Sequence, residues 1–373
     1  SLVMKEPVKV LMVAINGYGH YYLKTMLEET DCEDVVLVGV VDPNSKQAET
    51  IAAKHNCKAF ASTKELKGEV DAVSIVTPTK FHCSTAIEFL AQGVPCMVEK
   101  PLASTVPEAK LIVNAAKRAG TLLQVGHIER FNPGFTTVAE SCLRPKYIEA
   151  HRLAPFSGRG LDVGVVMDLM IHDIDLVLSL VKSHVVSIDA TGVSIMGQHE
   201  DLANARVHFA NGSVATLTAS RVHPQAVRTM NLFGSEGFTS IDFGKKNCTL
   251  IQPTLSFRNG VPDVRNLDPQ SMTRFKETLF SDYLPMKQTA ESKLDQLTAE
   301  LTDFTEAVRT GRQPKVTGED GLAAVTLAQS IIANIGSHDW EGNGQHFGAC
   351  DLPIYQGPLF HVEKSDVQLS KAA

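Results

Sequence analysis

Three ionisable side chains in this sequence, Lys100, Asp168 and His172, could together support the oxidation of an alcohol. Lys100 follows Glu99 at the abrupt end of an apolar run, and a lysine ammonium in such a place can hold a substrate hydroxyl and lower its pKa. Asp168 and His172 are four residues apart, so on a helix they would share one face. A histidine oriented by a carboxylate can act as the general base that removes a hydroxyl proton during hydride transfer.

Each of these features also has a purely structural explanation. A Glu-Lys pair after a strand is usually a solvated turn, and an aspartate at a helix start is usually a cap. A metal site built from His172, Asp173 and Asp175 is disfavoured, because adjacent and i,i+3 positions of one helix do not converge on a single ion. No cluster of histidines and cysteines accompanies them, so we expect no metal.

The elements that must position these residues are visible in the first half of the chain, where buried strands alternate with helices. Apolar runs of strand length cover residues 8–15, 35–41, 72–76, 95–98 and 122–125. Helical stretches lie between them, at 20–29, 45–55, 84–92 and 106–119. This alternation predicts an α/β domain with a doubly wound parallel sheet, which we assign to residues 1–126. Ligands bind at the carboxyl ends of strands in such sheets, where we also find Thr77, Pro78 and His82.

The second half of the chain shows antiparallel signals, and we assign residues 127–373 to an α+β domain. Strand-like runs over 203–219 flank Asn211-Gly212, a dipeptide typical of a type I′ hairpin turn. Residues 230–243 predict a second strand pair. Two predicted helices close the body of the chain and are candidates for packing back on the first domain, at 293–310, ended by Gly311, and at 321–333.

The turn after the first predicted strand, residues 14–19, is a partial match to a dinucleotide-binding fingerprint. That fingerprint has glycine at its first, third and sixth positions, whereas here Ala14 and Asn16 replace the first two of these and only Gly19 fits. Gly17 is an additional glycine, and with Gly19 it still lets the backbone approach a pyrophosphate at a helix N-terminus. Asn16, Gly17, Tyr18 and Gly19 are therefore candidate cofactor contacts, with a glycine turn that binds nothing as the alternative.

Asp42 strengthens the case for a dinucleotide. It ends the second predicted strand, about 20 residues after the glycine turn, where an acidic side chain accepts hydrogen bonds from the ribose hydroxyls. A carboxylate there repels a 2′-phosphate, so NAD is favoured over NADP, although Lys46 nearby weakens that preference. A turn aspartate before proline is the alternative.

Bulk composition excludes several classes of function. The 373-residue chain has a formal net charge of −7 and no basic footprint, so we do not expect it to bind nucleic acid. It contains no run of about 18 apolar residues, so we expect no membrane span. Its seven cysteines are widely spaced without a CxxC pair, which indicates a reducing compartment. We therefore expect a cytoplasmic protein of two domains.

In their order and spacing, these motifs resemble the Gfo/Idh/MocA oxidoreductases. The resemblance rests on the glycine turn, Asp42, Thr77-Pro78 with His82, Glu99-Lys100-Pro101 and Asp168-x-x-x-His172. It implies a Rossmann domain followed by a large, mostly antiparallel sheet, with the active site between them. It also implies a catalytic group of Lys100, Asp168 and His172, and a Lys100-Pro101 bond that is often cis. The chain would self-associate as a homodimer or homotetramer through the open face of the second sheet.

A narrower resemblance, to the branch of UDP-N-acetylglucosamine 3-dehydrogenases, comes from residues 126–133 and 152–168. It implies oxidation of the 3-hydroxyl of a nucleotide sugar. Arg130, Arg152 and Arg159 could then hold the pyrophosphate through bidentate hydrogen bonds, and His127 and Asn132 could read the sugar hydroxyls or the acetamido group. The alternative is that the arginines form structural pairs with nearby acids such as Glu129 and Asp162.

The leading expectation is thus an NAD-dependent dehydrogenase of a nucleotide sugar. A free sugar or inositol dehydrogenase on the same scaffold is the enzymatic alternative, and tight binding of UDP would argue against it. A non-catalytic dinucleotide or sugar sensor is the other alternative, with the altered glycine turn as a mark of lost turnover. A pure binder does not need Lys100, Asp168 and His172 together, which argues against the sensor.

Overall fold

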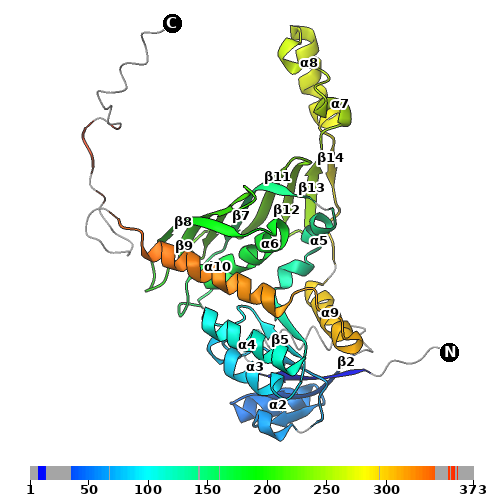
Figure 1. Ribbon diagram of the computed structural model, residues 1–373, viewed down its shortest axis with the longest axis vertical. Helices are drawn as coiled ribbons and strands as arrows, with labels where there is room; N and C mark the ends of the chain where they lie inside the picture. Colours follow the sequence, from blue (N-terminus) through cyan, green and yellow to red (C-terminus); the bar gives the residue numbers. More distant parts are fainter. Residues whose placement is uncertain are drawn as a thin grey trace, which may run out of the picture.

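The computed structural model describes residues 7–13, 35–66, 68–141, 143–158, 160–293, 295–340, 352, 354–357 and 359. Two sheets dominate these residues, a parallel one in the lower part of Figure 1 and a large, mostly antiparallel one above it. Helix α10 (Gly318–Gly336) lies between the two sheets in that view. No helix among the described residues is long and apolar enough to cross a membrane.

Six of the described strands form the parallel sheet, in the order β3-β2-β1-β4-β5-β6. The order reverses between β1 and β4, and open α/β sheets bind ligands outside the carboxyl ends of the strands at such a point. The doubly wound parallel sheet predicted from alternating apolar runs is confirmed. Its strands are β1 (Val8–Val13), β2 (Val35–Val41), β3 (Lys58–Phe60), β4 (Ala72–Ile75), β5 (Cys96–Glu99) and β6 (Leu123–Gly126).

Helices α2 (Ser45–Lys54), α3 (His82–Leu90) and α4 (Val106–Ala119) pack on this sheet. Local sequence explains where α4 begins and ends. The Thr105 hydroxyl accepts a hydrogen bond from the Glu108 amide at its start, and Gly120 adopts a left-handed φ of +60° at its end. These are the bounds that the sequence predicted for this helix.

The second sheet contains eight of the described strands, in the order β14-β13-β12-β11-β7-β10-β9-β8. Neighbouring strands are antiparallel except for the central pair β7 and β10, which is parallel. Both predicted strand pairs appear as hairpins, β9–β10 and β11–β12. The strands are β7 (Pro145–Leu153), β8 (Val185–Val193), β9 (Leu202–Phe209), β10 (Val214–Ser220), β11 (Val227–Gly234), β12 (Gly237–Asp242), β13 (Asn247–Ile251) and β14 (Met286–Gln288).

The turn of the β9–β10 hairpin is not the predicted type I′ turn. A type I′ turn needs positive φ at two successive residues, whereas Gly212 (φ +88°) is left-handed and Asn211 is not. The Gly212 amide donates to the Phe209 carbonyl, and the Phe209 amide donates to the Ser213 carbonyl. The connection is therefore a longer loop in which one left-handed glycine turns the chain back into β10.

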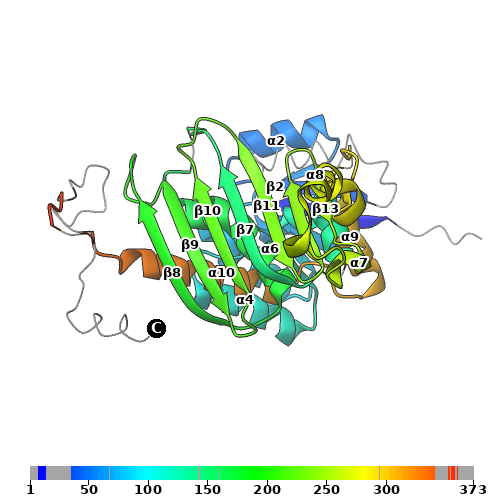
Figure 2. The same ribbon diagram turned by 90° about the horizontal axis from the view of Figure 1, so that it is seen from above.

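The large sheet has a covered and an open face. Helices α5 (Pro133–Glu140), α6 (Ile171–Val181) and α10 lie on the covered side, and Figure 2 shows the open face toward the viewer. Residues of β9 alternate accordingly, with Ala205 and Val207 buried, while Asn204 and His208 are only partly so. This period of two is what a strand exposed on one face requires.

Helices late in the chain return to the parallel sheet. Helix α9 (Gln296–Thr310) buries Leu297, Leu301 and Phe304 in one apolar cluster with Met12 and Met97 of the sheet. Helix α10 contacts both α4 and α6, so it touches elements of both halves of the chain.

A helical extension leaves the body between β13 and β14 and contains α7 (Leu255–Arg258) and α8 (Pro269–Thr278) (Figure 1). The rings of Phe257, Phe275 and Tyr283 pack together there, with centroids 4.9 to 5.9 Å apart. This extension was not predicted from the sequence, where α7 is only four residues long and α8 is mostly polar.

Candidate active site

The candidate site lies where three turns leave neighbouring strands of the parallel sheet. Strands β4, β5 and β6 are adjacent, and Glu99 at the end of β5 pairs with Gly126 at the end of β6. Lys100 and His127 follow β5 and β6 directly, and Thr77 lies two residues after the end of β4. The topology therefore brings side chains from distant parts of the sequence to one edge of the sheet.

Lys100 connects this edge to the second half of the chain. Its ammonium donates a hydrogen bond to the Asp168 backbone carbonyl at 2.7 Å, and it lies 3.4 Å from the Asp168 carboxylate oxygen Oδ1. The Lys100-Pro101 peptide bond is cis, as the family resemblance implied. The structure thus brings together Lys100 and Asp168, two of the three predicted catalytic residues.

The backbone that contacts Lys100 departs from α-helix geometry. Asp168 lies in a π-helical turn, Val166–Met170, that runs directly into α6. In a regular α-helix a carbonyl accepts from the amide four residues later, whereas a π-turn shifts that pattern by one residue. The Asp168 carbonyl that accepts from Lys100 belongs to this turn.

The predicted role of Asp168 as the carboxylate that orients His172 is wrong. The Asp168 carboxylate faces Lys100, and the buried Nδ1 atom of His172 has no hydrogen-bond partner among the described residues. The prediction assumed a regular helix with i,i+4 neighbours, and the π-helical turn changes that register. Asp168 is instead the partner that holds the lysine.

His172 is held in its neutral form. Burial lowers its pKa well below the ordinary histidine value, and the nearby positive charges of Lys100, Arg152 and Arg228 lower it further. Neutral imidazole has a free lone pair, so His172 can accept a proton at neutral pH.

His82 connects the two turns that carry Thr77 and Lys100, and its predicted contact with the cofactor is not what the structure favours. It is 1% exposed, with Nδ1 2.9 Å from the Pro101 carbonyl and Nε2 2.9 Å from the Thr77 carbonyl. Burial lowers its pKa, which the hydrogen bonds to these carbonyls oppose. Both ring nitrogens thus face backbone carbonyls of the protein, to one of which a neutral ring donates, and His82 lies between the two turns.

Arg152 has a structural role, contrary to the predicted contact with a pyrophosphate. The side chain is buried; its Nε and Nη2 atoms donate to the Asp173 carboxylate at 3.0 and 2.8 Å, and Nη1 donates to Glu129 at 3.0 Å. The Nε, Nη1 and Nη2 donors of the guanidinium are therefore all directed at these two carboxylates and not at a ligand. The pairing with Glu129 that we weighed as the alternative is present.

Arg130 is engaged in the same way. Its Nε and Nη2 atoms donate to the Asp175 carboxylate at 2.7 and 2.9 Å, and Nη2 lies 3.7 Å from Asp320 of α10. Asp173 and Asp175 are therefore counter-ions of arginines. No group of three or more potential metal ligands occurs in the described part of the chain.

Asn132 is also structural and does not face a sugar. It is fully buried, its side-chain oxygen accepts from the Gly134 amide at the start of α5, and its amide donates to Glu129 and to the Phe243 carbonyl, each at 3.1 Å. The sequence GHIERFNP at 126–133 is thus explained largely by internal packing and capping.

The remaining predicted residues have less definite environments. His127 is 1% exposed, and neither ring nitrogen has a hydrogen-bond partner among the described residues. Burial lowers the pKa of His127; the negative charge of Asp175 opposes this effect and the positive charge of Arg130 adds to it. Asp42 ends β2, where its carboxylate accepts from the Asn44 amide at 2.8 Å. Arg159 and the glycine-turn residues 16–19 lie outside the described residues.

Arg228 is a candidate that the sequence analysis missed. It is exposed near the start of β11 and lies near enough to His172 to lower the pKa of that histidine. The predicted strand began at Met230, three residues after the observed start of β11 at Val227, so Arg228 fell outside it. A strand that begins earlier would have placed it opposite Arg152, as the structure does.

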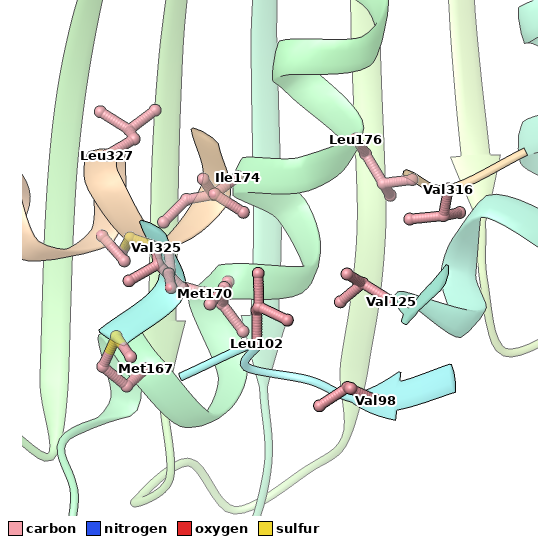
Figure 3. Close-up of a cluster of buried hydrophobic side chains, with 14 of the residues drawn as sticks. Val98, Leu102, Val125, Met167, Met170, Ile174, Leu176, Val316, Val325 and Leu327 are labelled. Carbon is pink, nitrogen blue, oxygen red and sulfur yellow. The ribbon is translucent and has the colours of Figure 1, made fainter. Parts of the chain in front are cut away.

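A shared apolar core holds the two groups of predicted catalytic residues together. Figure 3 shows Leu102, just after the Lys100 turn, beside Met170 of the π-helical turn, with Ile174 of α6 and Val325 of α10 close by. All four side chains are fully buried. Close packing of this kind resists displacement, so Lys100, Asp168 and His172 belong to one rigid unit.

Comparison with known proteins shows what this arrangement resembles. A family model described as an oxidoreductase family with an NAD-binding Rossmann fold, GFO_IDH_MocA, matches residues 8–127, and the GFO/IDH/MocA C-terminal domain matches residues 144–240. The chain is 35% identical over 296 residues to UDP-N-acetylglucosamine 3-dehydrogenase of Acidithiobacillus ferrooxidans, covering 79% of this chain and 88% of that relative. It is 26% identical over 350 residues to scyllo-inositol 2-dehydrogenase (NAD(+)) of Bacillus subtilis, covering 88% and 94%.

Solved structures agree with these similarities. A structure of the Acidithiobacillus ferrooxidans enzyme matches with a TM-score of 0.75 at 31% identity, covering 88% of this chain and 98% of that one. A myo-inositol 2-dehydrogenase from Lactobacillus plantarum, at 19% identity and a TM-score of 0.67, shares the fold over 88% of this chain and 97% of its own.

Proposed function

This chain belongs to the Gfo/Idh/MocA family of NAD-binding oxidoreductases, and we propose that it oxidises the 3-hydroxyl of UDP-N-acetylglucosamine or a related nucleotide sugar. The observation that carries the proposal is the contact between Lys100 and Asp168 beside a neutral His172. The similarity to the Acidithiobacillus ferrooxidans enzyme supports the choice of sugar.

The described residues fit an NAD molecule at the carboxyl edge of the parallel sheet. The Thr77 hydroxyl at the end of β4 is buried without a hydrogen-bond partner among the described residues, so it can bond to a ligand there. Asp42 at the end of β2 suits the adenosine ribose. When bound, NAD⁺ supplies the ring that accepts a hydride from the sugar carbon.

Lys100 and His172 divide the proton chemistry in this proposal. The Lys100 ammonium donates a hydrogen bond to the sugar hydroxyl oxygen, which lowers the pKa of that hydroxyl. His172 accepts the hydroxyl proton on Nε2, since Nδ1 is the buried nitrogen. The hydroxyl proton thus moves to His172 while the carbon-bound hydrogen leaves with two electrons, and a carbonyl forms on the sugar. Asp168 keeps the lysine in place.

Arg228 replaces Arg130 and Arg152 as the arginine that we assign to the nucleotide diphosphate. Arg130 and Arg152 are paired with carboxylates, whereas Arg228 is exposed and near enough to His172 for its charge to lower the pKa of that histidine. A guanidinium binds phosphate oxygens with bidentate geometry. Arg159 stays a candidate for the same role.

Replacing Asp42 by asparagine is expected to weaken NAD binding about tenfold and to leave NADP binding nearly unchanged. The amide oxygen can still accept from the Asn44 amide, so the turn is kept while the charge that repels a 2′-phosphate is removed. Dissociation constants for both cofactors, measured by fluorescence titration, check the result. Equal weakening of NAD and NADP would remove Asp42 from the ribose site.

The sugar substrate is tested by the absorbance of reduced nicotinamide, with purified protein, NAD and a panel of candidates. The panel contains UDP-N-acetylglucosamine, free N-acetylglucosamine, glucose and inositol, with an aminotransferase and glutamate to trap a keto sugar. Turnover with the UDP sugar alone supports the proposal. Turnover with inositol or a free sugar would keep the family and reject the nucleotide sugar, and NAD binding without any turnover would favour the sensor.

We further propose that the chain is cytoplasmic and self-associates through the open face of the large sheet. Tyr147, Phe233 and Phe238 form an aromatic group on neighbouring strands of that face, with adjacent ring centroids 5.8 and 4.8 Å apart. An apolar patch on an open sheet face is suited to a twofold partner. Sedimentation analysis that returns only monomers at assay concentration would reject the self-association.

A further inference from the structure

Helix α6 carries His172 in its first turn, and that turn has no local cap. The helix follows the π-helical turn directly, and its N-cap residue, Met170, makes no side-chain capping hydrogen bond. A cap is the usual local device that fixes how a helix begins. The orientation of the first turn of α6, and with it that of His172, therefore depends on contacts with other elements.

Two aspartates that follow His172 supply such contacts. The Asp173 carboxylate accepts from Nε and Nη2 of Arg152 in β7, at 3.0 and 2.8 Å. The Asp175 carboxylate accepts from Nε and Nη2 of Arg130, at 2.7 and 2.9 Å. Each pair is bidentate, which fixes direction as well as distance. Because residues two apart do not share a helix face, the two arginines hold α6 from different sides.

Both ion pairs lead back to one short segment, the 3₁₀ helix η4 (Ile128–Phe131). It contributes Arg130 to one pair and Glu129 to the other, where Glu129 Oε1 accepts from Arg152 at 3.0 Å. The second oxygen of Glu129 accepts from Asn132 and from Gln296 of α9, each at 3.1 Å. Donors from three different elements thus hold this carboxylate in place. We call the η4–α6 clamp the five residues Glu129, Arg130, Arg152, Asp173 and Asp175.

Segment η4 also belongs to the sheet edge that carries Lys100. It begins one residue after β6, and Gly126 at the end of β6 pairs with Glu99 at the end of β5. Lys100 follows Glu99 directly. The clamp therefore ties the first turn of α6 to the strand next to the one that ends at Lys100. In the proposed reaction Lys100 and His172 act on the same hydroxyl, so their relative position matters.

The apolar core and the clamp constrain α6 in different ways. Figure 3 shows Met170 packed beside Leu102, which opposes separation of the two segments, but apolar contacts are not directional. With side chains a helix is about 5–6 Å in radius, so a rotation of about 10° moves a side-chain end by about 1 Å. A misplacement of about 1 Å can cost about a hundredfold in rate. Bidentate bonds on two sides of α6 oppose such a rotation.

We propose that the η4–α6 clamp sets the position of His172 relative to Lys100, and that Arg152 and Asp173 are positioning residues for the base. The inference rests on the proposed function only in treating Lys100 and His172 as catalytic. Arg152 and Asp173 are both buried, and their paired atoms face each other. They act through the backbone of α6, in which Asp173 is the residue after His172.

Hydrogen–deuterium exchange tests the clamp without sugar or NAD. Asp173→Asn keeps the size of the side chain but turns one acceptor into an amide donor that faces a donor of Arg152. Amides of residues 166–175 should then exchange at least about tenfold faster than in the wild type. Asp303→Asn is the matched control, because the Asp303 carboxylate pairs with Arg312 at 2.8 Å and accepts from the Lys315 amide, outside α6 and η4. Equal exchange of these amides in the two variants would overturn the proposal.

Kinetics with UDP-N-acetylglucosamine test the positioning role. Arg152→Lys keeps the positive charge, but an ammonium cannot replace the bidentate bond to Asp173. In both Asp173→Asn and Arg152→Lys, kcat should fall at least about tenfold while the dissociation constant of NAD stays within about twofold. The rates are compared at a temperature where circular dichroism shows every variant folded. Asp303→Asn should lower the melting temperature and keep the wild-type kcat.

The outcomes separate positioning from stability. Wild-type kcat in Arg152→Lys, or an equal fall of kcat in Asp303→Asn, would overturn the positioning role, because the clamp would then act on stability alone. Arg152→Lys decides the question by itself if Asp173→Asn does not fold. Faster exchange in α6 of a protein that oxidises no sugar would keep the clamp and reject the proposed function instead.

Discussion

Replacing Lys100 by methionine is expected to lower kcat at least about a thousandfold while NAD affinity stays within about threefold of wild type. Methionine has nearly the length of the lysine side chain and can occupy the same space, but it offers no charge and no hydrogen-bond donor. The bond to the Asp168 carbonyl is lost, and so is the group that polarises the sugar hydroxyl in the proposed reaction. The loss therefore falls on the chemical step.

Steady-state absorbance assays and an NAD titration separate the two effects of the Lys100 substitution. Lys80→Met is the matched control, since Lys80 follows the neighbouring strand β4 and its ammonium lies 5.0 Å from the centre of the Phe81 ring. Its removal should change kcat by less than about threefold. A Lys100→Met enzyme with near-normal kcat would end the catalytic assignment, and one that had lost NAD binding would make Lys100 a cofactor residue.

The second large effect is expected at His172, where alanine should lower kcat at least about a hundredfold by removing the general base. The pH dependence gives a sharper test. Because burial and neighbouring cations hold the pKa of His172 well below its ordinary value of about 6.5, the base stays neutral under mildly acidic conditions. The wild-type kcat/KM should therefore be maintained as the pH falls through that value, and decline only at lower pH.

Initial rates over a range of sugar concentrations and pH values check the role of His172. His338→Ala, near the end of α10, where the ring stacks edge-on against Trp340, is the control and should keep the wild-type rate. A loss confined to KM would make His172 a binding residue. An acid limb at the ordinary histidine value would contradict the environment that the structure gives it.

The parallel sheet could be predicted from sequence because each of its elements has a local signal. Val35–Val41 is a continuous apolar run, as strands buried on both faces require, and α4 has its Thr105 cap and its terminal Gly120 within its own sequence. The hairpins β9–β10 and β11–β12 could also be predicted, because the paired strands follow one another in the sequence. The parallel pairing of β7 with β10 joins strands that are far apart in the chain, and no local pattern encodes it. The domain boundary at 126/127 stays a prediction.

The residues proposed as catalytic could be singled out from their types and their positions in the sequence, but their hydrogen-bond partners could not. Lys100, Asp168 and His172 follow strands or start a helix, which is visible in the sequence. Tertiary packing decides which charged side chains pair, and the sequence does not show it. Arg152 was therefore assigned to a ligand, although its guanidinium donates its hydrogen bonds to Asp173 and Glu129. His82 and Asn132 were misassigned for the same reason, since a buried polar side chain and a binding side chain look alike in sequence.

Glu300 of α9 is the opposite case, a buried acidic residue that was not singled out from the sequence. An acidic residue within a helix is ordinarily solvated, so residue type alone does not separate Glu300 of α9, which is 0% exposed, from its exposed neighbours. Its spacing from Leu297 and Phe304 places it on the buried face, and that signal could have singled it out once the apolar stripe was recognised.

The measurement that tests the central claim most directly follows the hydrogen that is transferred. UDP-N-acetylglucosamine carrying deuterium at sugar carbon 3 is incubated with the protein and NAD, and the reduced nicotinamide is examined by mass spectrometry, with the sugar labelled at carbon 2 as the control. We expect one deuterium in the reduced cofactor from the carbon-3 label and none from the carbon-2 label. Reduced cofactor without deuterium from carbon 3 would contradict oxidation at the 3-hydroxyl, and with it the proposed function.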